Sequence, residues 1–203
     1  MRESGAGFSL VELMVVIGLV TAISAVILFN QSAFQNSILL GNLVYDVAIS
    51  VREAQTYGIS TRGTSASLFT SAYGIHFSSN TNTTQVPSII SYLLFADIAA
   101  DDGLYVSGAD QPVRTLSIQS GYKIEKLCMT ISPNPEECSV PGGQVWIADV
   151  SFKRPYPDAR IKVDPGTGFV VATGLKVVLK SPKGDTRYVE ILQTGQLSIQ
   201  QHL

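Results

Sequence analysis

The carboxylate of Glu12 lies near the start of an otherwise unbroken apolar run that extends from Phe8 to Phe29. A helix over these residues would be about 33 Å long, which matches a membrane hydrocarbon core of about 30 Å. A charge near the bilayer centre costs about 2.5–3.5 kcal/mol on insertion scales, so intramembrane carboxylates usually mark a function. On a helix, Phe8 and Glu12 share one face, and Glu12 could pair with an α-amine if the chain began at Phe8. The alternative is a carboxylate that only extends to the membrane interface.

Two other sets of side chains could carry chemistry. His76 lies in a predicted strand and His202 is the penultimate residue, and neither belongs to a Ser/His/Asp or metal-binding pattern. We expect both histidines to be structural or solvent-exposed. Asp97, Asp101 and Asp102 could bind calcium through oxygen ligands, but their spacing does not match an EF-hand loop. An acidic turn is therefore the preferred interpretation.

Lys153, Arg154 and Arg160 surround two prolines in "FKRPYPDARI". A solvated loop is the default interpretation, and a partner-binding loop is the alternative. The glycine-rich "DPGTG" lacks the lysine and the helix of a phosphate-binding loop, so it predicts a hairpin turn. Cys128 and Cys138 are the only cysteines and have no nearby histidine, which argues against zinc. The sequence predicts no enzyme activity, no cofactor and no metal.

The composition favours a globular domain attached to a membrane. The chain has 203 residues and a net charge of −2, with no basic block of the kind that binds nucleic acid. Without the apolar run it is still long enough to bury a sizeable core. We expect no nucleic-acid partner.

Helical periodicity continues after the apolar run. Apolar residues recur at three- and four-residue steps over residues 30–58, and Gly58 is a candidate helix stop. No proline interrupts residues 8–58, so one continuous helix is expected. Its apolar stripe needs a partner, which an antiparallel sheet can supply. The predicted fold class is α+β, with a long N-terminal helix packed on one or two antiparallel β-sheets.

Alternating patterns and turn signals predict the strands in residues 59–203. The predicted strands are Ser67–Phe69, Tyr73–Phe77, Ser88–Phe95, Val113–Ile118, Tyr122–Ile131, Gln144–Phe152, Ala159–Val163, Gly168–Thr173, Leu175–Lys180, Arg187–Gln193 and Gln196–Ile199.

The N-terminal segment resembles the class III signal of type IV pilins and pseudopilins. That family has a polar leader ending in glycine, then phenylalanine, then glutamate four residues further on, and these positions are Gly7, Phe8 and Glu12 here. The segment "VREAQTYGIST" and the C-terminal stretch from "ARIKVDPGTG" to "TGQLSIQ" resemble the H-type minor pseudopilins of type II secretion and related fimbrial minor pilins.

The resemblance implies four regions: a leader over 1–7, a transmembrane helix half over 8–29, an amphipathic half over 30–58, and a β-rich extracytoplasmic domain over 59–203. A prepilin peptidase would cut between Gly7 and Phe8, Phe8 would be N-methylated, and Glu12 would set subunit register during assembly. The expected partners are other pilin or pseudopilin subunits, the peptidase and the inner membrane. Outside the cytoplasm disulfides persist, so a Cys128–Cys138 bridge is expected, with two free thiols as the alternative.

Other interpretations of the N-terminus and of the function stay open. The apolar run could be a cleaved secretory signal, with Ala22-Ile23-Ser24 as the cleavage site, or an uncleaved anchor. The favoured function is a structural subunit of a type IV pilus or a type II secretion pseudopilus. The alternatives are a monomeric membrane-anchored binding module and a DNA-uptake minor pilin, which the nearly neutral charge disfavours.

Overall fold

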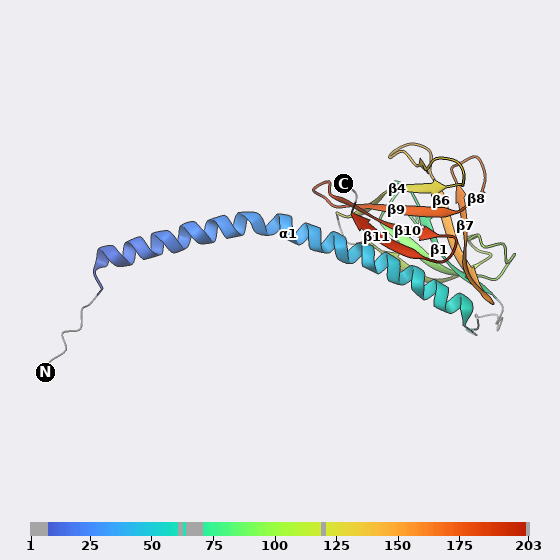
Figure 1. Cartoon of the computed structure of the whole chain (residues 1–203), viewed down its shortest axis with the longest axis horizontal. Coiled ribbons are helices and arrows are strands. Elements are labelled where there is room, and N and C mark those ends of the chain that lie inside the picture. Colours follow the sequence, from blue (N-terminus) through green and yellow to red (C-terminus); the bar gives the residue numbers. More distant parts are fainter. Residues whose placement is uncertain (1–7, 61–62, 64–70, 119–120, 202–203) are drawn as a thin grey trace. The chain divides into compact units, whose positions relative to one another are not determined.

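The computed structural model describes residues 8–60, 63, 71–118 and 121–201. Within these described residues, one helix, α1 (Leu10–Ile59), is followed by strands (Figure 1). The chain divides into two compact units, Met1–Ile38 and Leu39–Leu203, which we call the N-terminal and C-terminal units. The strands are β1 (Ala72–Ser78), β2 (Ser91–Asp97), β3 (Gln111–Ser117), β4 (Lys123–Thr130), β5 (Glu137–Cys138), β6 (Ile147–Lys153), β7 (Tyr156–Asp164), β8 (Val170–Ala172), β9 (Gly174–Lys180), β10 (Thr186–Leu192) and β11 (Leu197–Gln201).

The strands form two antiparallel sheets within the C-terminal unit. The six-stranded sheet has the order β3-β2-β1-β6-β7-β8, and the five-stranded sheet has the order β11-β10-β9-β4-β5. The predicted α+β class with antiparallel sheets is confirmed. Ten of the predicted strands overlap an observed one, whereas Ser67–Phe69 lies outside the described residues and β5 was not predicted. With two residues, β5 is too short to show an alternating pattern.

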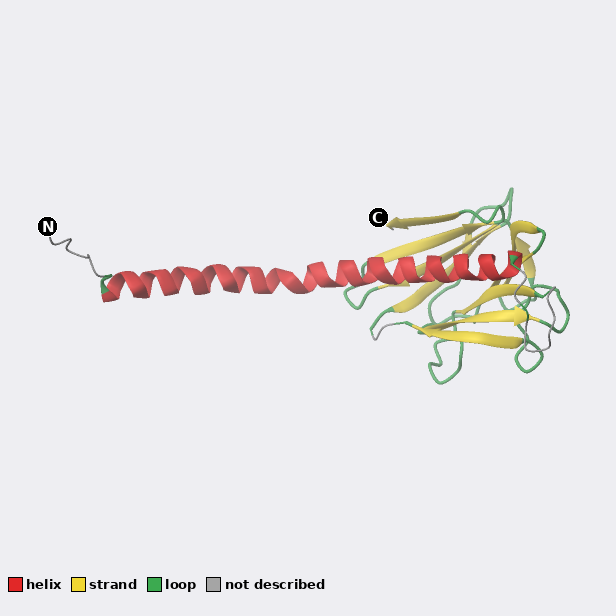
Figure 2. Cartoon of the chain, turned by 90° about the horizontal axis from the view of Figure 1, so that it is seen from below, coloured by secondary structure: helices red, strands yellow, loops and turns green. Residues whose placement is uncertain are grey.

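Helix and sheets share one apolar core in the C-terminal unit. Val44, Val47, Val51 and Ala54 are fully buried, and their three- and four-residue spacing places them on one face of α1. Tyr45 and the rest of the opposite face are exposed, and Figure 2 shows this end of α1 lying along the strands. Trp146, the only tryptophan of the chain, belongs to the same core.

Gly58 explains how closely the end of α1 approaches the six-stranded sheet. The helix ends at Ile59, one residue beyond the predicted stop. Gly58 is buried, and its carbonyl accepts a hydrogen bond of 3.1 Å from the backbone N–H of Arg154. A Cβ atom at this position would lie 2.3 Å from the carbonyl oxygen of Phe152. Gly58 therefore permits a close helix–strand contact, which is a different role from the predicted helix stop.

Candidate functional site

The first turn of α1 begins with a serine cap. The hydroxyl of Ser9 accepts a hydrogen bond of 3.2 Å from the backbone N–H of Glu12, and its carbonyl accepts one of 3.2 Å from Leu13. Serine followed by glutamate three residues later is the capping-box pattern. A carboxylate in the first turn is also stabilised by the helix dipole. Ser9 thus caps the first turn of α1, and the Ser-x-x-Glu spacing could have indicated this cap from the sequence.

The residues on either side of the predicted cleavage point lie before this cap. Gly7 lies outside the described residues. Phe8 is 79% exposed, and because α1 begins at Leu10, it precedes the helix rather than forming part of it. Phe8 therefore lies outside α1 in the uncut chain, and a shared helical face of Phe8 and Glu12 in a chain that begins at Phe8 stays a prediction. Ser9 caps the helix at the position where the spacing of Phe8 and Glu12 predicted a helical turn.

The apolar segment that follows Glu12 presents its side chains outward. Leu10–Leu28 is long and apolar enough to cross a membrane by length and composition, with a mean hydropathy of 2.6, and none of it is buried. Thr21 satisfies its hydroxyl internally by donating to the carbonyls of Ile17 and Gly18, both at 2.9 Å. A contiguous apolar surface of this size marks a membrane or protein contact. The N-terminal segment is thus a candidate single membrane anchor.

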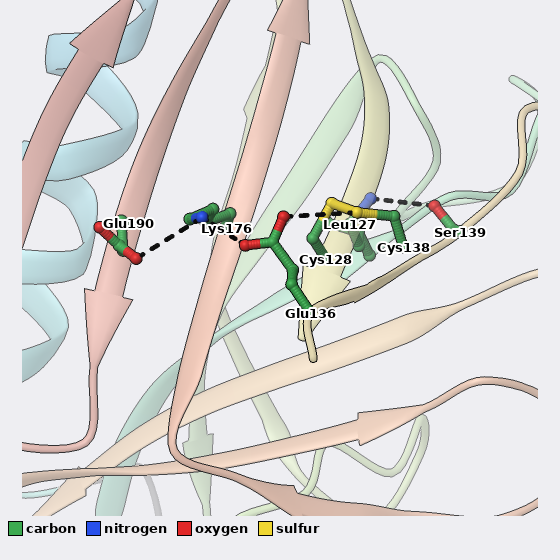
Figure 3. Close-up of a disulfide and its surroundings, with 7 residues drawn as sticks. All are labelled: Leu127, Cys128, Glu136, Cys138, Ser139, Lys176 and Glu190. Carbon is green, nitrogen blue, oxygen red and sulfur yellow. Dashed lines mark hydrogen bonds and ion pairs between the residues drawn. A yellow bond between two sulfur atoms is a disulfide. The ribbon is translucent and has the colours of Figure 1, made fainter. Parts of the chain in front are cut away.

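Cys128 and Cys138 lie directly opposite each other on β4 and β5 and form a disulfide. Cys128 is buried and Cys138 is half-buried. The carboxylate of Glu136 lies between the sulfur atoms and Lys176, with Oε1 3.7 Å from the Sγ of Cys138 (Figure 3). The Nζ of Lys176 on β9 lies 3.9 Å from the Oε1 of Glu190. The hydrogen bond that Lys176 donates to Glu136 raises the pKa of the Lys176 ammonium group. The bridge joins the edge strand β5 to the sheet.

His76 belongs to a buried polar pair. His76 on β1 and Asp149 on β6 are cross-strand partners, and Nδ1 lies 2.6 Å from the Asp149 Oδ1. Burial raises the pKa of the Asp149 carboxyl, and its contacts with His76 oppose that shift. The ring of Tyr105, from the segment between β2 and β3, covers His76 at a centroid distance of 5.0 Å. The prediction of a structural histidine is consistent with this arrangement, but the sequence pattern did not identify Asp149 as its partner.

The acidic turn is built around buried carboxylates. Asp97 accepts hydrogen bonds from the backbone N–H groups of Asp101 and Gly103, at 2.9 and 2.7 Å. Burial raises the pKa of Asp97, and these two bonds oppose the shift. Asp110 at the end of the segment accepts three more backbone N–H groups. The carboxylates therefore order the segment between β2 and β3, as expected of an acidic turn.

The basic residues of "FKRPYPDARI" flank a hairpin. The predicted solvated loop extends too far, because β7 begins at Tyr156, three residues before the predicted strand Ala159–Val163, and pairs with β6. Two prolines argue against a strand in general, but here one lies in the turn and the other close to the start of β7, where proline is tolerated. Lys153 and Arg160 both form ion pairs with Asp101, and Arg154 donates to the carbonyl of Ser60 at 3.1 Å. His202 lies outside the described residues.

No known protein family, curated protein or solved structure matches the chain.

Proposed function

We propose that this protein is a minor pilin or pseudopilin, a structural subunit that a prepilin peptidase cuts between Gly7 and Phe8. The observation that carries the proposal is a carboxylate, Glu12, in the first turn of an apolar segment that could span a membrane. In a signal peptide or a plain anchor, the only role of that carboxylate would be to stabilise the N-terminal end of the helix. The anchored chain would carry its C-terminal unit outside the cytoplasm and would act as the substrate of an enzyme rather than as an enzyme.

The chemistry of assembly follows from the new N-terminus. Cleavage would give Phe8 an α-amine with a reference pKa of about 8, which is mostly protonated at neutral pH. This cation would stand beside the positive end of the helix dipole, where it is unfavourable. Charges in hydrocarbon are tolerated when they are paired, so the Glu12 carboxylate of a neighbouring subunit would stabilise the amine and set the stagger between the two chains. The apolar and amphipathic segments of α1 would then act as one long helix, and N-methylation of Phe8 would complete maturation.

N-terminal analysis of protein from its native host tests the proposal. We expect a mature chain that starts at Phe8. Gly7→Leu should block processing, because a bulky residue would crowd the cleavage point, whereas Gly5→Leu in the same leader should be cut normally. A mature start near Ala25 would indicate a secretory signal, and an uncut chain would indicate a plain anchor. Either result would refute the pilin proposal.

Glu12→Val tests the assembly role separately from processing. Removing one partner of a buried ion pair typically costs about 3–5 kcal/mol, and the position near the interface suggests the lower end of that range. We expect Glu12→Val to be processed and membrane-inserted but to co-purify poorly with filaments at matched membrane levels. Thr21→Val is the matched control, because it removes a polar group from the same segment that bonds only within its own helix. Equal incorporation of both variants would refute a role of the Glu12 carboxylate in assembly.

A further inference from the structure

A pocket of about 530 Å³ lies at the end of the six-stranded sheet where β1 ends and β6 begins. Three segments of the chain converge on it: the β1–β2 connection, the β2–β3 connection and the residues that lead into β6. Ligand pockets commonly have this size, and they are often built from loops that a rigid sheet holds together. The pocket is therefore a candidate ligand site that is separate from the membrane segment.

His76 presents one ring nitrogen to this pocket. Its Nδ1 is hydrogen-bonded to Asp149, whose side chain is fully buried. Within the described part of the chain this is the hydrogen bond that the ring forms, and His76 lines the pocket, so Nε2 is the nitrogen left for a ligand. An ionised carboxylate only accepts hydrogen bonds, so Asp149 selects the tautomer that carries its proton on Nδ1. Neutral His76 therefore offers Nε2 as an acceptor in a fixed orientation.

Hydrogen bonds hold the walls of the pocket in place. The segment before β6 is tied to the end of β1, because the Ser79 N–H donates to the carbonyl of Trp146 at 2.9 Å and the Ser79 hydroxyl accepts from the Trp146 N–H at 2.7 Å. In the β1–β2 connection, the side-chain amide of Asn80 donates to that of Gln85. Asp110 orders the β2–β3 connection through three backbone N–H groups. Walls fixed in this way lose little conformational entropy when a ligand binds.

The lining groups indicate the class of ligand. Of the described residues that line the pocket, none is lysine, arginine, aspartate or glutamate, which favours a neutral ligand. The half-buried ring of Tyr105 lies over His76 at a centroid distance of 5.0 Å and places an apolar face beside the Nε2 acceptor. Exposed Ser107 and Gln85 add groups that can donate and accept hydrogen bonds. Vicinal hydroxyls beside an apolar C–H face match this combination.

We propose that the pocket binds a neutral pyranose sugar. One sugar hydroxyl would donate to the Nε2 of His76, and the apolar face of the ring would pack on Tyr105. The side chains of Ser107 and Gln85 would bond the remaining hydroxyls at the rim. The proposal does not depend on the filament function, because it uses residues of the C-terminal unit alone.

Saturation-transfer difference NMR tests the proposal on the full chain in a detergent that has no sugar headgroup. The probes are the methyl glycosides of glucose, galactose, mannose and N-acetylglucosamine. A ligand of about 13 non-hydrogen atoms that binds with ordinary efficiency has a Kd of about 1 mM. We expect at least one glycoside to bind with about this Kd. Transfer should be strongest to the protons of its apolar face, since these would lie against Tyr105.

Two variants locate the sugar without removing the buried pair. His76→Asn keeps an N–H donor at the position of Nδ1 for Asp149 but deletes Nε2, and Tyr105→Leu keeps an apolar side chain but removes the ring face. We expect each to weaken binding about tenfold. Tyr45→Leu is the matched control, because Tyr45 is an exposed tyrosine on α1 that does not line the pocket. Urea denaturation followed by Trp146 fluorescence shows which variants are folded, and either folded variant is sufficient for the test.

Three results would overturn the proposal. The first is no transfer to any of these glycosides at about 10 mM, tenfold above the expected Kd. The second is unchanged binding by a folded His76→Asn or Tyr105→Leu chain, which would place the sugar elsewhere. The third is equal affinity for cyclohexanol, which has a ring of similar size without vicinal hydroxyls and would indicate an unspecific apolar pocket.

Discussion

Replacing Gly58 by alanine should destabilise the C-terminal unit, although alanine is the more favourable residue within a helix. The new Cβ would lie 2.3 Å from the carbonyl oxygen of Phe152 and 2.8 Å from its carbonyl carbon. Ordinary contacts of this kind are about 3.5 Å, so the end of α1 must move away from β6 by about 1 Å. That movement also lengthens the hydrogen bond from Arg154 to the Gly58 carbonyl, now 3.1 Å.

The expected change in the free energy of unfolding of Gly58→Ala combines three contributions. Overpacking costs about 1–3 kcal/mol, and the weakened backbone hydrogen bond costs about 1 kcal/mol. The higher helix propensity of alanine stabilises the folded chain by about 1 kcal/mol and offsets part of this cost. The net loss in the free energy of unfolding should be about 1–3 kcal/mol.

Urea denaturation of the full chain in detergent, followed by the fluorescence of Trp146, measures this loss. Trp146 is the single tryptophan and lies in the core of the C-terminal unit, so its signal reports unfolding of that unit. Gly18→Ala is the matched control, because Gly18 is also helical but a Cβ atom added there would meet nothing within 4 Å. We expect the control to leave the transition unchanged. A Gly58→Ala chain as stable as the unaltered one would refute the close-contact argument.

Two further predictions concern buried and paired charges. His76→Leu should lower the free energy of unfolding by about 3–5 kcal/mol, because Asp149 is left buried without its partner. The double variant His76→Leu with Asp149→Leu should recover most of that loss, which urea denaturation of both variants measures. If the double variant lost as much stability as the single one, the result would contradict this prediction. Burial raises the pKa of Glu125, but the hydrogen bond from Lys180 and the charge of Lys123 outweigh it, so the pKa is lowered from 4.5. A lowered carboxyl pKa adds stability above pH 4.5 that is lost as the pH falls through the folded-state value. Stability measured from pH 6 to pH 3 should therefore decline more steeply for the unaltered chain than for Glu125→Gln, and parallel curves would count against this ion pair.

Interactions between residues close in the chain determine much of the secondary structure of this protein and its fold class. The apolar run, the three- and four-residue spacing of Val44, Val47 and Val51, and the turn at "DPGTG" each report interactions between residues close in the chain. Such interactions predicted the helical segments, most of the strands and the α+β class. The Ser9–Glu12 cap belongs to the same kind and was available from the spacing alone.

The tertiary structure decided which distant residues meet. Asp149 is 73 positions from His76, and Lys176 is 40 positions from Glu136, so no local pattern could pair them. Strand order and register bring these side chains together, and both depend on how the whole core packs. The same reason explains Gly58. Its place at a helix end was visible in the sequence, but the need for a missing Cβ arises from Phe152, on a strand that only the folded chain places against it.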